Sequence, residues 1–263
     1  MLDRIEIFDR SDWQMSLGTR AAFEGMLTQL KPELSIEIGT AQGGSLDRIA
    51  AHSAEVHALD LTGRLLVNCP ANATFHEGDS RVVLPQLLSR LAADGRNVDF
   101  ALVDAAHSAA GVRADLEALL SSPALERTVI LVHDSFNPEV RDGIRSLDWR
   151  VHPKVVGIEL DFVPGRMVRS GSFAGQLWDG LALVVVDERP GRPGLPTVEI
   201  ANVGFEAEPL EFHDAHETIR RASPLISSPA ARLRREVELL LSSLRWRLSR
   251  APASLGGRLG RRR

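Results

Sequence analysis

The chain has 263 residues, of which 44% are hydrophobic and 25% charged, a composition typical of a soluble globular protein with a sizeable buried core. Its one cysteine, Cys69, excludes an internal disulfide framework and a zinc site built from several cysteines. No apolar run approaches the roughly 20 residues of a transmembrane helix.

The charge is unevenly distributed along the chain. Residues 229–263 hold ten Arg and two Glu, a local charge of +8, so the remainder carries 21 basic and 33 acidic residues, or −12, and the total is −4. An acidic body argues against nucleic acid as a partner. The first residues, MLDRIEIFDRSDWQ, lack the apolar segment of a signal peptide, so we expect a cytoplasmic protein.

The first 150 residues alternate between strand and helix patterns. A helix is predicted over 16–31, before Pro32. Short apolar runs predict strands at 34–38, 55–59, 98–103 and 128–132, with a weaker one at 72–76. Helical patterns lie between most of them, at 44–52, 80–93 and 108–120. This alternation predicts a mostly parallel sheet with helices on both faces.

The pattern changes after residue 150. Two further strands, 154–163 and 180–188, are separated by a Gly- and Arg-containing stretch without a clear helix, which predicts an antiparallel pair at the sheet edge. We therefore expect one α/β domain over 1–187 and a Pro- and Glu-rich extension, loop or lid, over 188–228. Residues 229–263 form a basic amphipathic segment with three readings: a helix packed on the body or on a second subunit of a homo-oligomer, an interfacial helix on anionic lipid at the inner membrane face, or a solvated end.

The loop after the first strand is the first candidate binding site. In the stretch LSIEIGTAQGGSLDRIA, residues 34–50, Gly39 and Gly43 would let a ligand approach the backbone at a helix N-terminus. Asp60, at the end of the next strand, follows Gly39 by 21 residues, the position from which an acid grips ribose hydroxyls. Asp79 ends the third strand region, where an adenine amino group could be recognised.

Polar residues also follow the fourth and fifth strands. Asp104 and His107 come after the fourth strand, and Asp134 comes after the fifth. Because neighbouring parallel strands bring their carboxyl ends together, Asp104 and Asp134 are expected to converge beside the cofactor loop. Two carboxylates suit a hard divalent ion such as Mg²⁺, which lowers the pKa of a bound hydroxyl. His107 could then remove the hydroxyl proton as a general base.

The pattern E-x-G-x-x-x-G-x-S over residues 37–45 resembles motif I of the class I S-adenosylmethionine-dependent methyltransferases, particularly their O-methyltransferase branch. The resemblance implies a Rossmann-like fold with a mostly parallel seven-stranded sheet, an antiparallel edge strand and helices on both faces. It implies S-adenosyl-L-methionine as cofactor, with the amino-acid moiety on the motif I loop, the ribose on Asp60 and the adenine between Asp79 and Ser80. The cofactor contacts expected in all are Glu37, Gly39, Thr40, Gly43, Ser45, Asp60, Asp79, Ser80 and Asp104.

A second stretch, DFALVDAAHSAAGVRADLEA, is similar to the D-x-x-H-x-Y-x-x-V-x-x-D segment of the metal-dependent macrocin-type sugar O-methyltransferases. That resemblance implies Asp104 as a metal ligand and His107 as the base. The chain departs from the pattern in two places. The aromatic position holds alanine, and Asp134-Ser135 stands where an Asp-Asp or Asp-Asn pair is expected after the fifth strand. Asp104, Asp134 and Ser135 are therefore the expected metal ligands, with His133 and Asn137 as alternatives to Ser135.

The function indicated is O-methylation of a hydroxyl on a small molecule or glycan, most consistent with a sugar of a surface polysaccharide or glycosylated metabolite. Two alternatives stay open: a hydroxylase-like or other enzyme on the same domain, and a non-catalytic cofactor-binding scaffold in glycan assembly. Other candidates are weaker. Arg166, Arg169 and Trp178 fall where an insertion would cover the acceptor pocket, and His152, His213 and His216 are better explained as solvated residues.

Overall fold

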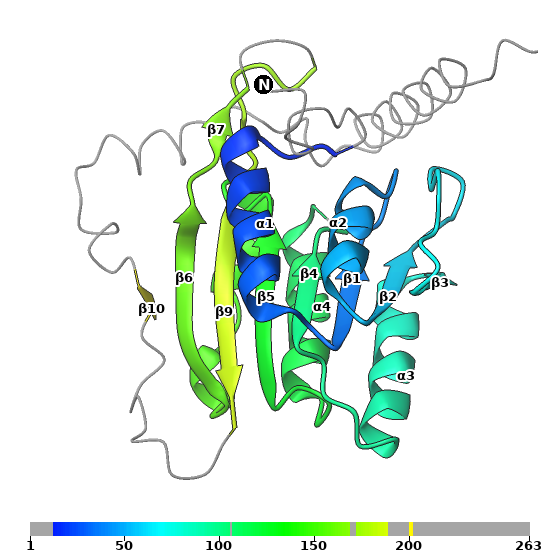
Figure 1. Ribbon diagram of the computed structural model, residues 1–263. Helices are drawn as coiled ribbons and strands as arrows, with labels where there is room; N and C mark the ends of the chain where they lie inside the picture. Colours follow the sequence, from blue (N-terminus) through cyan, green and yellow to red (C-terminus); the bar gives the residue numbers. More distant parts are fainter. Residues whose placement is uncertain (1–12, 106, 169–171, 189–199, 202–263) are drawn as a thin grey trace, which may run out of the picture.

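The structure is a computed structural model that describes residues 13–105, 107–168, 172–188 and 200–201. One sheet runs through the whole body (Figure 1). Its strands are β1 (Leu34–Ile38), β2 (Glu55–Asp60), β3 (Ala73–Glu77), β4 (Phe100–Val103), β5 (Arg127–His133), β6 (Val155–Val163), β9 (Leu181–Asp187) and β10 (Ile200–Ala201). Their spatial order is β10-β6-β9-β5-β4-β1-β2-β3.

The strand order is that of a doubly wound sheet, with β1 at the switch point between β2 and β4. Every pairing is parallel except those of β9, which runs antiparallel to both β5 and β6. The predicted Rossmann-like class is confirmed. The antiparallel strand, however, lies inside the sheet rather than at its edge. The crossover from β5 to β6 leaves a gap one strand wide, and an antiparallel strand needs no crossover helix to fill it.

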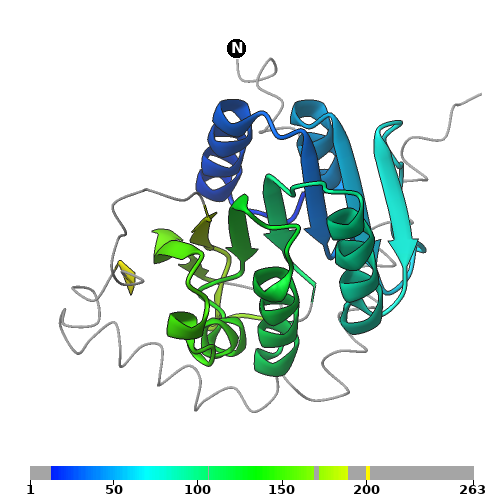
Figure 2. The same cartoon turned by 90° about the horizontal axis from the view of Figure 1, so that it is seen from below.

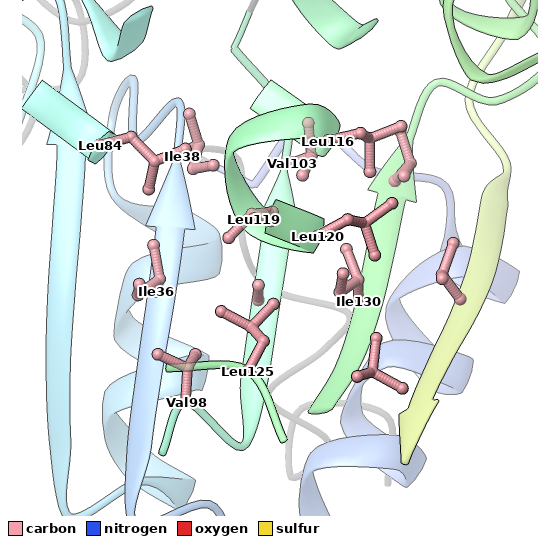
Figure 3. Packing of buried hydrophobic residues seen from close by; sticks show 14 of the residues in the cluster. Ile36, Ile38, Leu84, Val98, Val103, Leu116, Leu119, Leu120, Leu125 and Ile130 are labelled. Carbon is pink, nitrogen blue, oxygen red and sulfur yellow. The ribbon is translucent and has the colours of Figure 1, made fainter. Parts of the chain in front are cut away.

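Helices cover both faces of the sheet, as the views from the side and from below show (Figures 1 and 2). They are α1 (Leu17–Leu30), α2 (Gly44–His52), α3 (Ser80–Ala93), α4 (Ala109–Ser121) and α5 (Pro138–Arg145). Alternate residues of β4 divide between two apolar clusters because strand side chains point to opposite faces. Phe100 packs with residues of α1 and α2, whereas Val103 packs with residues of α3, α4 and α5 (Figure 3).

Most predicted elements agree with the structure to within two residues. Among the described residues, four features were not predicted: α5, the 3₁₀ turn Trp149–Val151, a hairpin of β7 (Arg166–Met167) with β8 (Leu177–Trp178), and the short strand β10. Short elements carry little periodicity, although Asn137 caps α5 ahead of its first residue, a recognisable start signal. Apart from residues 188, 200 and 201, the predicted extension and basic tail lie outside the described residues. Among the residues described, no helix has the length and apolarity needed to cross a membrane.

Candidate active site

The loop between β1 and α2 turns sharply at two glycines. Gly39 has φ +95° and Gly43 has φ +90°, a region that favours glycine. A Cβ on Gly39 would lie 2.3 Å from the main-chain oxygen of Asp104, and one on Gly43 would lie 2.9 Å from Cδ1 of Leu66. Close packing against the main chain therefore requires Gly39, whereas at Gly43 the positive φ is the stronger constraint because the end of the Leu66 side chain can move.

Glu37, near the end of β1, is fully buried beneath this loop. Ser45 donates a hydrogen bond of 2.5 Å to Oε1, and the other carboxylate oxygen, Oε2, has no hydrogen-bond partner among the described residues. Burial raises the pKa of Glu37 to about 8, although hydrogen bonds from Ser45 and Thr40 oppose the shift. A buried acid with an unused oxygen is suited to a cationic ligand group.

The raised pKa predicts a pH-dependent stability of the cofactor-free protein. The folded pKa of about 8 lies above the ordinary value of 4.5, so the folded chain retains this proton where the unfolded chain releases it. The free energy of unfolding should therefore fall as the pH rises from about 4.5 to about 8, by on the order of a few kcal/mol. Urea denaturation across this range should show a shallower fall in Glu37→Gln. Parallel profiles for the two proteins would contradict the prediction.

Asp60, at the end of β2, braces the glycine loop. Its Oδ2 accepts the main-chain N–H groups of Thr40 (3.0 Å) and Ala41 (2.8 Å), and Oδ1 accepts that of Thr62 at 3.3 Å. The residue predicted to hold ribose thus also holds the loop that it faces. Ala41 has φ +45°, so the two bonds to Oδ2 stabilise a turn of unusual backbone geometry.

Asp79 and Ser80 have partners within the chain. Asp79 caps α3 by accepting the N–H of Arg81 at 3.0 Å, and its hydrogen bonds to Arg81 lower the pKa of its carboxyl to about 2. Ser80 donates to Oδ1 of Asp115 at 2.7 Å. Asp115 matches the final aspartate of the D-x-x-H-x-Y-x-x-V-x-x-D pattern. It is 1% exposed, and burial raises its pKa to about 6. No role for Asp115 was predicted, although its place in that pattern was a signal.

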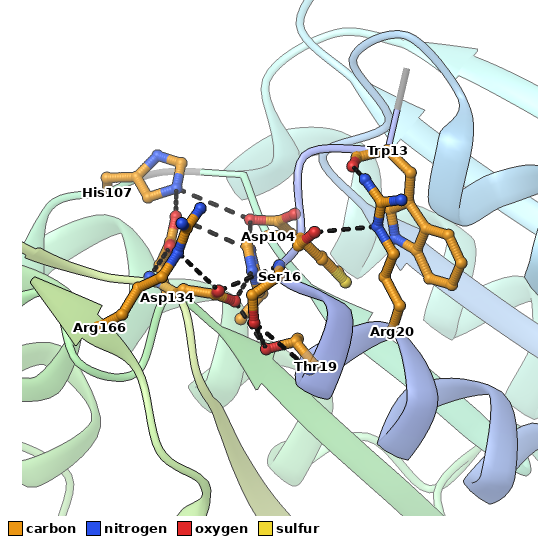
Figure 4. Close-up of polar contacts among 11 residues, drawn as sticks. Trp13, Ser16, Thr19, Arg20, Asp104, His107, Asp134 and Arg166 are labelled. Atoms are coloured by element: carbon orange, nitrogen blue, oxygen red, sulfur yellow. Dashed lines mark hydrogen bonds and ion pairs between the residues drawn. The ribbon is translucent and has the colours of Figure 1, made fainter. Parts of the chain in front are cut away.

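A second polar group lies where β4 and β5 end side by side (Figure 4). Nε2 of His107 is 2.7 Å from Oδ2 of Asp134 and 3.7 Å from Oδ1 of Asp104. The predicted convergence of Asp104 and Asp134 is thus observed, and His107 contacts both. Burial would raise the pKa of Asp104, but the charge of His133 and hydrogen bonds from His107 and His133 outweigh it, and the pKa is lowered.

His133 lies at the centre of this group. Its Nδ1 is 3.0 Å from Oδ1 of Asp104 and 3.7 Å from Oδ2 of Asp134, and the ring is buried. Burial alone would lower its pKa, but the carboxylates of Asp104 and Asp134 raise it well above the usual value. Asp104, His133 and Asp134 offer ligand atoms that all lie within 4.8 Å of one another. Of the other candidate ligands, Ser135 is fully buried with no described partner for Oγ, and Asn137 caps α5.

Asp179 completes the group and was not predicted. It immediately precedes Gly180 and β9, with φ +70°. Because β9 is antiparallel, its amino end lies at the carboxyl edge of the parallel strands. An acid at the start of an antiparallel strand was therefore the missed signal. Hydrogen bonds from His133, Ser16 and Thr19 outweigh the effect of burial and lower the pKa of Asp179 to about 2.

The hairpin of β7 and β8 contacts this group of polar residues. The ring centroid of Trp178 is 5.4 Å from that of His107 and 5.0 Å from that of Phe173. Nε of Arg166 is 3.4 Å from Oδ2 of Asp179. The hairpin thus carries two of the three residues predicted to cover an acceptor.

The remaining predicted positions add nothing to this group. Arg169, His213 and His216 lie outside the described residues. His152 lies just before β6, at the amino ends of the parallel strands, whereas the site lies at their carboxyl ends.

Comparison with known proteins agrees with the topology. Residues 36–135 match a family model described as a methyltransferase domain, a match over less than half of the chain. No curated protein matches in sequence. Among solved structures, the chain is similar to an O-methyltransferase from Bacillus cereus in complex with SAH, with 17% identity, a TM-score of 0.47, and coverage of 65% of this chain and 80% of that one.

Two further solved structures are similar at the same level. An O-methyltransferase from Streptomyces achromogenes, involved in tomaymycin synthesis and in complex with SAM, matches with 17% identity, a TM-score of 0.48, and coverage of 69% of this chain and 85% of that one. A TDP-rhamnose 3'-O-methyltransferase of calicheamicin biosynthesis matches with 18% identity, a TM-score of 0.44, and coverage of 73% and 86%. Similarities this remote do not indicate a substrate.

Proposed function

We propose that this chain is a class I S-adenosylmethionine-dependent methyltransferase and that it methylates a hydroxyl group on a sugar of a surface polysaccharide or glycosylated metabolite. The observation that carries the hydroxyl-directed chemistry is the 2.7 Å contact between His107 Nε2 and Asp134 Oδ2, at strand ends beside the glycine loop. The resemblance of the DxxH stretch to sugar O-methyltransferases supports the sugar. The neighbouring Trp178 offers a ring on which a sugar face could stack.

The chain's first task is to hold and align its two substrates. S-adenosylmethionine supplies an activated methyl group that passes to the acceptor oxygen as the carbon–sulfur bond breaks, leaving S-adenosylhomocysteine. Glu37 would face the cationic amino-acid end, and Asp60 would accept the ribose hydroxyls while bracing the loop. The loop is held between β1 and the main chain of Asp104, so little rearrangement is needed when substrates bind.

The second task is removal of the acceptor proton, because a neutral alcohol is a weak nucleophile. When Nε2 of His107 carries the hydrogen donated to Asp134, the ring nitrogen Nδ1 takes the acceptor proton. Asp134 fixes the orientation of the ring and stabilises the imidazolium that forms. In this pairing the histidine acts as the base and the carboxylate orients it, as in other enzymes that use a histidine base.

The donor set also fits a divalent ion. Asp104, His133 and Asp134 would supply two carboxylates and one imidazole, with ligand atoms close enough to share one ion. An ion bound there would lower the pKa of an acceptor hydroxyl. Mg²⁺ takes oxygen ligands almost exclusively, whereas imidazole suits ions such as Mn²⁺, Fe²⁺ or Zn²⁺. The imidazole of His133 therefore widens the expected choice of ion beyond Mg²⁺.

The cofactor assignment predicts a loss of affinity in Asp60→Ala. Removal of a carboxylate that accepts hydroxyl hydrogen bonds should weaken S-adenosylmethionine binding roughly 10- to 100-fold, with a further loss from the unbraced loop. Isothermal titration calorimetry measures the change directly. Asp94→Ala, at the far end of α3, serves as the control and should bind as the unmodified protein does. Equal affinities for all three proteins would exclude Asp60 from the cofactor site.

The reaction itself is tested by acceptor-dependent turnover. The protein, S-adenosylmethionine and a panel of sugar-bearing acceptors should release S-adenosylhomocysteine and yield products heavier by one methyl group. Fragmentation by mass spectrometry locates that group, which is expected on an oxygen. Methylation on nitrogen or carbon, with no reaction at hydroxyls, would overturn the proposal.

A further inference from the structure

Asp179 touches more parts of the candidate site than any sequence pattern suggested. The residue is 4% exposed, and its carboxylate accepts hydrogen bonds from two groups at the start of α1: the Ser16 N–H at 3.0 Å and the Thr19 hydroxyl at 2.7 Å. Arg166, from the β7–β8 hairpin, lies 3.4 Å away on the same oxygen as Ser16. Both carboxylate oxygens of Asp179 thus bind the scaffold of the domain.

The same carboxylate and the main chain of Asp179 also contact the site. Oδ1 of Asp179 lies 3.4 Å from Nε2 of His133, whose Nδ1 meets Asp104 at 3.0 Å, so the ring is held between two carboxylates. The main-chain N–H of Asp179 donates to Oδ1 of Asp134 at 2.6 Å, and the second oxygen of Asp134 contacts His107. Side chain and main chain of one residue therefore reach two different members of the group.

The backbone around Asp179 is held in an uncommon geometry. Asp179 and Asp134 have φ +70° and +55°, and few residues other than glycine adopt such values. Gly180, at φ +86°, packs so closely that a Cβ would lie 2.8 Å from the main-chain oxygen of Val163. Strained geometry persists where surrounding contacts over-determine it, and such positions concentrate at functional sites.

We infer that Asp179 is a positioning residue for the methyl-transfer site, orienting His133 through its carboxylate and Asp134 through its main-chain N–H. The inference rests on the proposed function. Its consequence is that the start of α1 and the β7–β8 hairpin are coupled to the site through one buried carboxylate. A carboxylate behind a histidine fixes the direction of the ring's other nitrogen, here toward Asp104 and Asp134.

The test compares Asp179→Asn with Thr19→Ala. Asparagine tolerates the left-handed backbone and keeps the main-chain N–H, so only the charge and one acceptor are lost. We expect kcat to fall 10- to 100-fold, the range for second-layer partners of site histidines, with S-adenosylmethionine affinity unchanged within about twofold. The ring ¹⁵N signals of His133 should shift in nuclear magnetic resonance spectra. Thr19→Ala removes only the hydroxyl donor to Oδ1, the oxygen that also faces His133, and keeps the charge of the carboxylate, so it should shift those signals much less than Asp179→Asn does.

A second variant, Asp179→Gly, guards against a folding defect, because glycine accepts φ +70° without strain and also retains the main-chain N–H. It should shift the His133 signals as Asp179→Asn does. Unshifted His133 signals in both variants, or equal losses of kcat in Asp179→Asn and Thr19→Ala, would overturn the inference and reduce Asp179 to an anchor of α1. The ring spectra require no acceptor, so they are read separately from any failure of hydroxyl methylation.

Discussion

Replacing His107 with alanine is expected to abolish most turnover while leaving S-adenosylmethionine binding intact. A positioned general base contributes roughly 10²- to 10⁴-fold to a rate, and kcat should fall by that amount. His107 contacts Asp134 and Asp104 at the ends of β5 and β4, whereas the predicted cofactor contacts lie mostly on β1, β2 and the loops that follow them. Loss of the ring should therefore affect proton removal and not cofactor affinity.

The measurement is kcat with a responsive acceptor, together with a calorimetric titration of the cofactor on the same preparation. His152→Ala is the matched control, because this histidine lies at the amino ends of the parallel strands, away from the carboxyl ends that carry the site. It should retain full activity. Normal turnover by His107→Ala would show that another group removes the proton. Loss of cofactor binding in that variant would instead indicate damage to the fold.

The candidate site could be predicted in part because topology alone brings some of its residues together. Asp104 and Asp134 follow β4 and β5, which are hydrogen-bonded neighbours, so any parallel reading of the two apolar runs places them side by side. Buried parallel strands also read as continuous apolar runs, and the strand boundaries agree for that reason. His107 then follows Asp104 at the start of α4.

An acid at the start of an antiparallel strand was a signal for Asp179, but the residues that it contacts could not be found in this way. Its position depends on β9 entering the sheet between β5 and β6, which no local pattern specifies. Had the strand lain at the edge, as the sequence suggested, Asp179 would not have adjoined His133 at the end of β5. Long-range strand order is decided by packing of the whole sheet, and short apolar runs carry little information about it.

A second limit on prediction from the sequence was that it does not reveal the hydrogen-bond partners of polar side chains. Spacing indicated ligand roles for Asp79 and Ser80 but gave no sign of the partners that they have within the chain, Arg81 and Asp115. Helix caps and buried pairs use the same residue types as ligand sites, so the sequence alone does not distinguish the two uses. The glycine loop shows a related overlap, because Gly39 faces the main chain of Asp104.

That close approach makes Gly39→Ala the second change with a large expected effect. The new Cβ would lie 2.3 to 2.6 Å from main-chain atoms of Asp104 and Ala105, which cannot move aside as a flexible side chain would. The backbone at φ +95° adds strain for any residue with a Cβ. Overpacking and strain together should lower the free energy of unfolding by roughly 2 to 5 kcal/mol. Displacement of Asp104 should lower kcat as well.

Substitutions of two further glycines, measured by urea denaturation, separate the effect of backbone strain from the effect of steric contact. Gly95 has φ +65° with open space around it, so Gly95→Ala measures backbone strain alone and should cost about 1 kcal/mol. Gly25 lies inside α1 with open space and no unusual φ, and Gly25→Ala should stabilise the protein by up to about 1 kcal/mol. If Gly39→Ala costs no more than Gly95→Ala, the contact with Asp104 is not a constraint. A cost several times larger would show that Gly39 is constrained by its contact with the main chain of Asp104, the acid that neighbours His107.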